Sequence, residues 1–282
     1  MEATVLLSDG SEATFGNMTL DEMNNKIASN ESLESNILEG IFNLLNEEQN
    51  RKIIENNFPQ KAVARRNTGY ALDVLLNSIF ITGIPQSINL CKLLAGSEGT
   101  LCFFTELKLG LIDCPPANNV LLCAHFTSLR ECLDANVIAV QHNPYASELV
   151  DKRILDFTKD HPVFNAHRFF IDGDPEAILM IEFFPDEFSD ARSQAEKLVI
   201  DLENRGLGYA FPVLTNEEIQ YAWEIRKAGL GLLRNMPGDI QPVNLIEDCA
   251  VTIDDLPHYA DDIMVLLNKY GLTASYYAHA GA

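Results

Sequence analysis

The sequence predicts an α+β protein built from two domains. Its 282 residues are enough for about two domains, and 47% hydrophobic with 22% charged residues is typical of globular proteins. After residue 120, strand-like and helix-like segments alternate, which favours an antiparallel sheet with helices packed on it. The prolines in Cys114-Pro115-Pro116 stop a strand and extend the chain. We therefore expect domains over residues 1–116 and 117–282.

In the first domain, turn and cap signals separate the predicted elements. Asp9-Gly10 is a hairpin signal, and Thr19 followed by Glu22 is a capping box that begins a helix. Further helices follow from apolar residues at helical spacing, and Phe58-Pro59 ends one of them. Strands are predicted over residues 3–8, 12–16 and 101–109, and helices from residue 19 and over residues 37–56, 71–76 and 88–94.

In the second domain, apolar runs predict strands, and capping residues mark the helices. Asn216 is the expected cap of one helix, and Gly206 and Gly271 end two others. Strands are predicted over residues 120–123, 137–141, 177–184, 248–253 and 272–278. Helices are predicted over residues 128–136, 146–157, 189–205 and 216–233, and from Asp254 or Asp255 to residue 269.

Charge and composition exclude several classes of protein. A formal net charge of −21 would repel a phosphate backbone, so nucleic-acid binding is not expected. No apolar run reaches the roughly 18 residues of a membrane span, and the N-terminus has no signal-peptide pattern. The six cysteines include no Cys-x-x-Cys pair, which favours reduced thiols over an iron–sulfur ligand set. We expect a cytoplasmic protein. Partner proteins could attach it to the surface of the inner membrane.

The segment Gly96-Ser97-Glu98-Gly99-Thr100-Leu101 is the most informative stretch of the chain. Its glycines allow close approach of a ligand, and successive amides in such a turn can bind an anion. The flanking residues 58–97 carry a local charge of +3, which favours a diphosphate despite the acidic chain. The alternatives are an ordinary turn and a chance fluctuation of charge.

These residues, together with Arg65-Arg66-Asn67-Thr68-Gly69-Tyr70-Ala71-Leu72-Asp73, resemble the FAD-linked oxidases of the vanillyl-alcohol-oxidase superfamily. The branch that they resemble contains D-lactate dehydrogenases and glycolate oxidase flavoprotein subunits, including large members fused to an iron–sulfur module. The resemblance covers residues 60–282. It implies the second half of a PCMH-type FAD-binding domain, followed by a ferredoxin-like α+β cap domain with an antiparallel sheet.

The resemblance also implies which residues contact FAD. Gly69 would permit close approach, and Tyr70 would pack against the cofactor or donate a hydrogen bond. The alternative for Tyr70 is an ordinary half-buried aromatic residue. The implied FAD-binding residues are Gly69, Tyr70, Gly96, Ser97, Glu98, Gly99, Thr100 and Leu101.

Two residues of the second domain are candidates for catalysis. Trp223 and Arg226 share one helix face because they are three residues apart, and a guanidinium can present a planar fork to a carboxylate. The resemblance implies that Arg226 binds the substrate carboxylate, and the alternative is a surface arginine stacked on Trp223. It also implies that His279 takes the substrate hydroxyl proton. In metal-dependent members of the resembled family, this histidine and a second one can hold a divalent ion; no histidine follows His279 here, so such a site would be incomplete.

Two acidic segments also resemble segments of the family. Glu247-Asp248-Cys249-Ala250-Val251 would orient a basic residue or line the substrate pocket, and the alternative is a turn. Glu148-Leu149-Val150-Asp151 is expected to be structural, at the interface between cap and FAD domain.

The resemblance implies an FAD-dependent dehydrogenase or oxidase of a D-2-hydroxy acid such as lactate or glycolate, with hydride passing to the flavin. Electrons would leave for an iron–sulfur module or another acceptor. Since no earlier glycine-rich pyrophosphate loop is present, the sequence is expected to be an internal fragment. The alternatives are a non-catalytic α+β module that binds a ligand or serves assembly without binding FAD by itself, and the phenol-oxidising branch of the superfamily.

Overall fold

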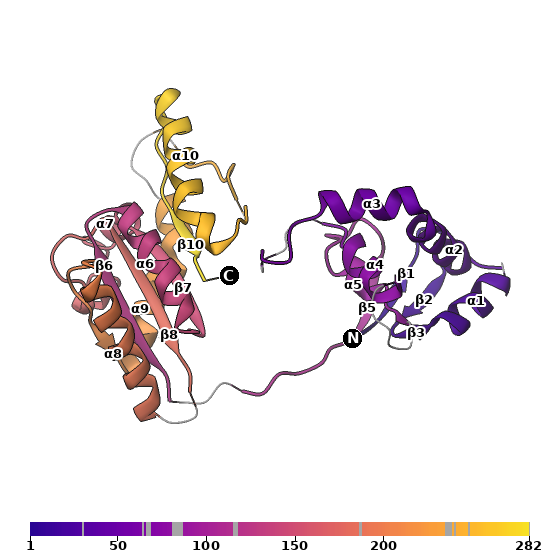
Figure 1. Cartoon of the computed structure of the whole chain (residues 1–282), viewed down its shortest axis with the longest axis horizontal. Coiled ribbons are helices and arrows are strands. Elements are labelled where there is room, and N and C mark those ends of the chain that lie inside the picture. The colour runs from indigo at the N-terminus through magenta and orange to yellow at the C-terminus, as the bar shows by residue number, and fades with distance from the viewer. Residues whose placement is uncertain are drawn as a thin grey trace. The chain divides into compact units, whose positions relative to one another are not determined.

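The structure is a computed structural model that describes residues 1–29, 31–63, 65, 69–80, 87–114, 118–185, 188–234, 239, 241–247 and 249–281. Residues Arg66 to Thr68, Pro115, Pro116, Asp248 and Ala282, which the sequence motifs include, lie outside the described residues. The chain divides into two compact units (Figure 1). The first contains Met1–Lys61 and Arg66–Asp113, and the second contains Ala62–Arg65 and Cys114–Ala282.

The first unit combines a three-stranded antiparallel sheet with helices. The sheet has the order β2-β1-β5, with bounds β1 (Glu2–Leu6), β2 (Glu12–Phe15) and β5 (Phe103–Lys108). A second, two-stranded sheet pairs β3 (Met18–Thr19) with β4 (Ser87–Ile88). The helices are α1 (Leu20–Ser29), α2 (Leu33–Asn46), α3 (Glu48–Asn57), α4 (Leu72–Phe80) and α5 (Cys91–Leu94).

Local signals in this unit are partly confirmed. Thr19 and Glu22 form the predicted capping box, because each side chain accepts a hydrogen bond from the other residue's backbone amide. The helix predicted over residues 37–56 is two helices, because Glu47 has extended backbone between α2 and α3. The helix predicted over residues 88–94 is also wrong in part, since Ile88 belongs to β4 and only Cys91–Leu94 is helical.

The second unit is a ferredoxin-like α+β fold, as predicted. Its sheet has the order β10-β7-β8-β6-β9, and all neighbouring strands are antiparallel. Without β10, this is the order of a ferredoxin-like βαββαβ unit, whose first and third strands are central. The unit comprises β6 (Val120–Phe126), α6 (Leu129–Gln141), β7 (Ala146–Asp151), β8 (Ala177–Phe183), α8 (Phe188–Asn204) and β9 (Val213–Leu214).

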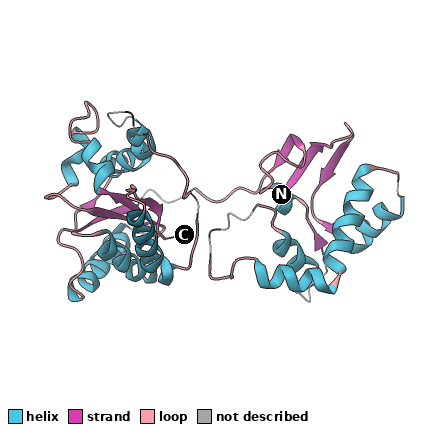
Figure 2. Cartoon of the chain, turned by 90° about the horizontal axis from the view of Figure 1, so that it is seen from above, coloured by secondary structure: helices cyan, strands magenta, loops and turns pink. Residues whose placement is uncertain are grey.

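Helices cover both faces of this sheet (Figure 2). On one face, α6 and α8 bury an apolar core that includes Phe126 and Phe183, and α10 (Leu256–Lys269) packs on α6. On the other face lie α7 (Lys152–Phe157), the 3₁₀ helix η1 (Ala166–Phe170) and α9 (Glu217–Arg234). The edge strand β10 (Tyr277–His279) pairs with β7, and its residue Tyr277 packs on the α9 side of the sheet.

Four predicted segments of this unit are wrong. Residues 137–141 continue α6, because Ile138 and Ala139 are buried on the helix's core face, which outweighs the strand preference of the β-branched residues. Residues 146–157 are a strand followed by a helix, and Asp151 caps the helix by accepting a hydrogen bond from the amide of Ile154. The described residues 249–252 and 272–276 are not in strands.

The buried His125 predicts a pH-dependent stability. Its Nδ1–H donates to the Cys123 carbonyl at 2.9 Å, and its Nε2 accepts from the Asp172 amide at 3.3 Å. Burial lowers the pKa of His125. Because the unfolded state then binds more protons, this stability is complete above about pH 6.5 and is lost as the pH falls through the folded pKa.

We expect the free energy of unfolding to fall by at most about 1.4 kcal/mol per pH unit from this histidine. His125→Asn should remove this contribution to the pH dependence of the free energy of unfolding, even though the substitution lowers stability at every pH. Urea unfolding at a series of pH values measures the slope, with the exposed His258→Asn as the control. An unchanged slope in H125N would contradict the assignment.

Candidate active site

The glycine-rich loop of the first unit brings all the predicted cofactor-binding residues together. A Cβ added to Gly96 would lie 2.4 Å from the Gly69 carbonyl oxygen, so only glycine fits this contact. The Tyr70 hydroxyl and Thr100 Oγ1 share a hydrogen bond of 2.7 Å across the same two segments. The segment that contains Gly69 and Tyr70 therefore packs against the loop that contains Gly96 and Thr100.

Two backbone amides of this loop donate no hydrogen bond within the described residues. Glu98 and Gly99 have positive φ angles of 48° and 75°, and among the described residues neither of their amides has a hydrogen-bond partner. The hydroxyls are already used, because Ser97 donates to Leu94 and Thr100 donates to Ser97. The loop therefore presents two adjacent backbone amides that could donate hydrogen bonds to an anionic or polar group.

In the second unit, three charged or titratable side chains meet on the α9 face of the sheet. The Arg226 Nη2 of α9 donates to Glu148 Oε2 of β7 at 2.9 Å. The His279 Nδ1 of β10 lies 2.6 Å from Glu148 Oε1. Strand register explains the second contact, because His279 is the direct partner of Glu148 across the β10–β7 ladder.

Arg226 is held rather than free on the surface. Its side chain is 12% exposed, and its guanidinium carbon lies 4.8 Å from the centre of the Tyr277 ring. The alternative of a surface arginine stacked on Trp223 is wrong, since Tyr277 provides the aromatic face. Within the described part of the chain, Arg226 Nε is buried and has no hydrogen-bond partner. A ligand atom that accepted from this donor would remove an unfavourable buried group.

A second carboxylate lies on the same sheet face. Glu182 Oε1 accepts from Asn119 Nδ2 at 2.8 Å and from Trp223 Nε1 at 3.4 Å. Burial raises the pKa of Glu182, and the two hydrogen bonds oppose that effect. Trp223 therefore orients α9 against β8, one helical turn from Arg226.

The backbone around His279 is anchored on both sides of β10. Before the strand, Asp151 accepts hydrogen bonds from the Ser275 hydroxyl and the Tyr276 amide. After it, Asn136 Nδ2 donates to the Ala280 carbonyl at 2.6 Å. The His279 side chain is 53% exposed, so its ring reaches solvent while its backbone is held in place.

Glu148 is the functional candidate that sequence reasoning missed. It was expected to be structural, within a segment predicted as a helix. A glutamate in a short apolar run is a signal that a buried partner exists, but that partner lies 78 residues away. Of the other acidic motif, Glu247 is exposed in a loop.

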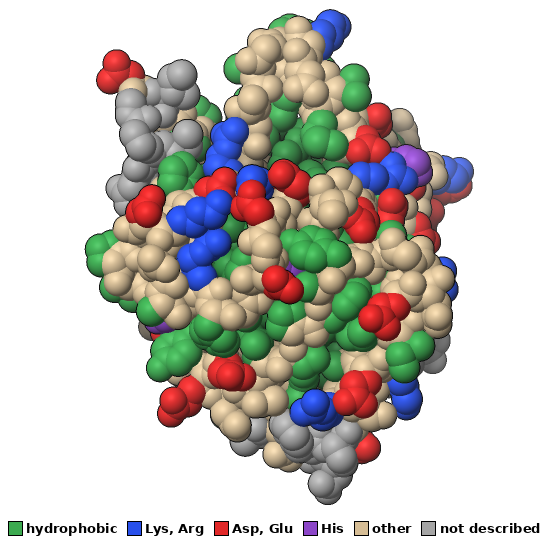
Figure 3. All heavy atoms as spheres, turned by 90° about the vertical axis from the view of Figure 1, so that its left-hand side faces the viewer, with side chains coloured by type: hydrophobic (Ala, Val, Ile, Leu, Met, Phe, Trp, Pro, Cys, Tyr) green, Lys and Arg blue, Asp and Glu red, His purple; other side chains and the backbone are tan. Residues whose placement is uncertain are grey.

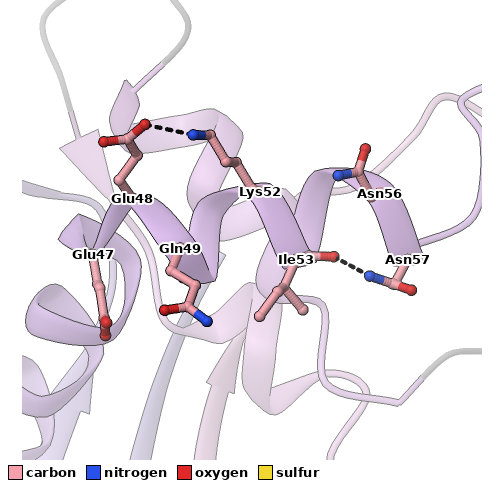
Figure 4. A pocket seen from close by; sticks show the side chains of 7 residues that line it. All are labelled: Glu47, Glu48, Gln49, Lys52, Ile53, Asn56 and Asn57. Atoms are coloured by element: carbon pink, nitrogen blue, oxygen red, sulfur yellow. Dashed lines mark hydrogen bonds and ion pairs between the residues drawn. The ribbon is translucent and has the colours of Figure 1, made fainter.

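The first unit also has a surface hollow, which lies on α3. The hollow has a volume of about 550 Å³ and lies on the outer face of the helix, where Glu48 pairs with Lys52 and Asn57 bonds to the Ile53 carbonyl (Figure 4). Its lining side chains are exposed on one helix, so we assign it no role. It is lined by Glu47, Glu48, Gln49, Lys52, Ile53, Asn56 and Asn57. Figure 3 shows acidic and basic side chains interspersed with apolar ones on the face that it draws.

The described residues include neither a membrane-spanning helix nor a metal-binding cluster. Within those ranges, no helix has the length and apolar character needed to cross a membrane. In the same part of the chain, no group of three or more His, Cys, Asp or Glu side chains is arranged to hold a metal ion.

Comparison with known protein families identifies the family of this α+β unit. Residues 115–282 match the family model of the C-terminal domain of FAD-linked oxidases. The chain belongs to this family.

Curated relatives have related names. The chain is 29% identical over 245 residues to a D-2-hydroxyglutarate dehydrogenase of Pseudomonas putida, which covers 84% of this chain and 23% of the relative. It is 27% identical over 246 residues to the Escherichia coli protein of the same name, covering 83% of this chain and 23% of the relative. It is 25% identical over 199 residues to glycolate oxidase subunit GlcD of Bacillus subtilis, covering 68% and 39%. The chain thus spans under a quarter of the length of the first two relatives.

Proposed function

We propose that this chain supplies the substrate site, and part of the FAD site, of an FAD-dependent oxidoreductase acting on a D-2-hydroxy acid. The observation that carries the proposal is the convergence of Arg226 and His279 on Glu148, with a buried donor of Arg226 left unpartnered. The family match and the names of the relatives support the reaction class. Residues 117–282 would form the substrate cap, and residues 1–116 the second half of the FAD-binding domain.

The loop residues would hold the cofactor. Gly69 and Gly96 allow close backbone approach, and the amides of Glu98 and Gly99 are the donors for a phosphate. Tyr70, Ser97, Thr100 and Leu101 complete the loop, with the hydroxyls of Tyr70, Ser97 and Thr100 hydrogen-bonded within it. FAD, when bound, supplies the acceptor for the hydride that leaves C2 of the substrate.

The cap residues would bind and deprotonate the substrate. Arg226 pairs with the carboxylate, which fixes C1 of the hydroxy acid. His279 accepts the C2 hydroxyl proton as the carbon–oxygen bond becomes a carbonyl. Loss of this proton and of the C2 hydride converts the 2-hydroxy acid into a 2-oxo acid. The two electrons would then pass to an iron–sulfur module or another acceptor.

Substitution of Arg226 by lysine tests the role of the guanidinium. Lysine retains the positive charge but lacks the planar fork, so recognition of a carboxylate weakens. With FAD-loaded protein, we expect kcat/KM for D-2-hydroxyglutarate, D-lactate or glycolate, whichever is the best substrate, to fall about 10- to 100-fold.

A substrate analogue provides the control for this experiment. The corresponding 2-hydroxy amide lacks the carboxylate, so R226K should leave its low rate nearly unchanged. Equal losses for the acid and the amide would show that Arg226 does not recognise the carboxylate. If the wild-type protein shows no flavin absorbance even when its flanking regions are present, the non-catalytic alternative is favoured.

A further inference from the structure

We propose that Glu148 is a positioning residue that sets the tautomer of His279 and so makes Nε2 the proton-accepting atom. The inference rests on the proposed function and assigns a role to a residue that the function itself does not require. It is carried by the two contacts of one carboxylate, to Arg226 and to His279.

The direction of the hydrogen bond follows from the chemistry of the groups. An ionised carboxylate can only accept, so the His279 Nδ1 at 2.6 Å must carry the hydrogen. In a neutral imidazole, the lone pair is then on Nε2, since only one ring nitrogen is protonated. When Nε2 takes a proton, the imidazolium is stabilised by the adjacent carboxylate, as in other carboxylate–histidine pairs.

Glu148 is placed well for this task. Its backbone lies in β7, which has hydrogen-bonded neighbours on both sides, β10 and β8. Its side chain is 13% exposed, and Arg226 supplies the positive charge that balances it. Tyr277 in turn covers the guanidinium. The Arg226 partner of the carboxylate is therefore restrained by packing, and the His279 partner by the pairing of β10 with β7.

The bridge also matches the shape of the proposed substrate. In a 2-hydroxy acid, the carboxylate and the hydroxyl are on adjacent carbons. The two protein groups that would receive them, the Arg226 guanidinium and the His279 imidazole, are joined through a single carboxylate group. Glu148 thus sets the spacing between the carboxylate-binding group and the base.

Nitrogen NMR of the histidine rings tests the tautomer directly. The chain has six histidines, so ¹⁵N-histidine labelling gives few signals, and His279→Gln identifies the relevant one. We expect wild-type His279 to be the Nδ1–H tautomer. In Glu148→Gln, it should shift toward the Nε2–H tautomer, because the anionic acceptor is gone.

The chain offers a matched control. Glu224 Oε2 lies 3.2 Å from Nδ1 of His167, so Glu224→Gln removes a second glutamate beside a histidine. It should leave the His279 signals unchanged. If Glu148→Gln does not fold, Glu148→Gln combined with Arg226→Met removes both charges and permits the same measurement. An unchanged His279 tautomer in the variant that lacks the Glu148 carboxylate would overturn the inference.

Kinetics separate this inference from the proposed function. In FAD-loaded protein, E148Q should lower kcat about 100-fold or more. A changed tautomer with wild-type kcat would overturn the positioning role while the proposed function stands. Wild-type protein that oxidises no 2-hydroxy acid would instead contradict the proposed function, and the NMR result would still decide whether Glu148 orients His279.

Discussion

Replacing His279 with glutamine is expected to lower kcat for the 2-hydroxy acid by about 10²- to 10⁴-fold in FAD-loaded protein. Glutamine can still accept a hydrogen bond, but it cannot take the hydroxyl proton at neutral pH. KM should change little, because the carboxylate contact is assigned to Arg226. Steady-state kinetics with an artificial electron acceptor measure both parameters.

The control for this experiment is His258→Gln, on the exposed side of α10. It should retain wild-type kcat. If H279Q loses less than about tenfold in kcat, or if both variants lose the same activity, His279 is not the base. The side chain is 53% exposed, so we expect the substitution to leave the fold intact.

Replacing Arg226 with alanine is expected to lower the free energy of unfolding of the second unit by about 3 kcal/mol. The substitution leaves the Glu148 carboxylate, which is 13% exposed, without its positive partner. Denaturant unfolding followed by tryptophan fluorescence measures this unit specifically, because Trp223 of α9 is the only tryptophan of the chain.

A charge-free double variant sharpens this second experiment. Arg226→Met with Glu148→Leu removes both members of the ion pair and replaces them with apolar groups of similar size. We expect it to recover most of the stability that R226A loses, because no unpaired charge stays buried. A double variant as unstable as R226A would mean that the loss came from packing rather than from the ion pair.

Local patterns account for most of the fold. Signals between residues close in sequence can be read along the chain. Examples are the capping box at Thr19, the start of a helix at Ser128 and the apolar strand Ala177–Phe183. The stretch over residues 137–141 was mistaken for a strand because β-branched residues favour strands, whereas its burial against the sheet keeps it helical.

The candidate site depended on the resemblance and on long-range pairing. Arg226 and His279 were placed in a site by family motifs, and no local pattern indicated that they share a carboxylate. The His279–Glu148 contact joins residues 131 positions apart, through the register of β10 on β7. Because residues 146–157 were predicted to be one helix, the sheet face carrying Glu148 could not be identified from the sequence.

Anaerobic reduction of the flavin tests the central claim most directly. FAD-loaded protein is mixed with a D-2-hydroxy acid, and the visible absorbance of the oxidised flavin is followed in the wild type, H279Q and the control H258Q. The account predicts rapid bleaching by the D enantiomer in the wild type and in H258Q, and bleaching slowed at least about 100-fold in H279Q. Equal bleaching rates in all three proteins, or none in the wild type with any 2-hydroxy acid, would contradict it.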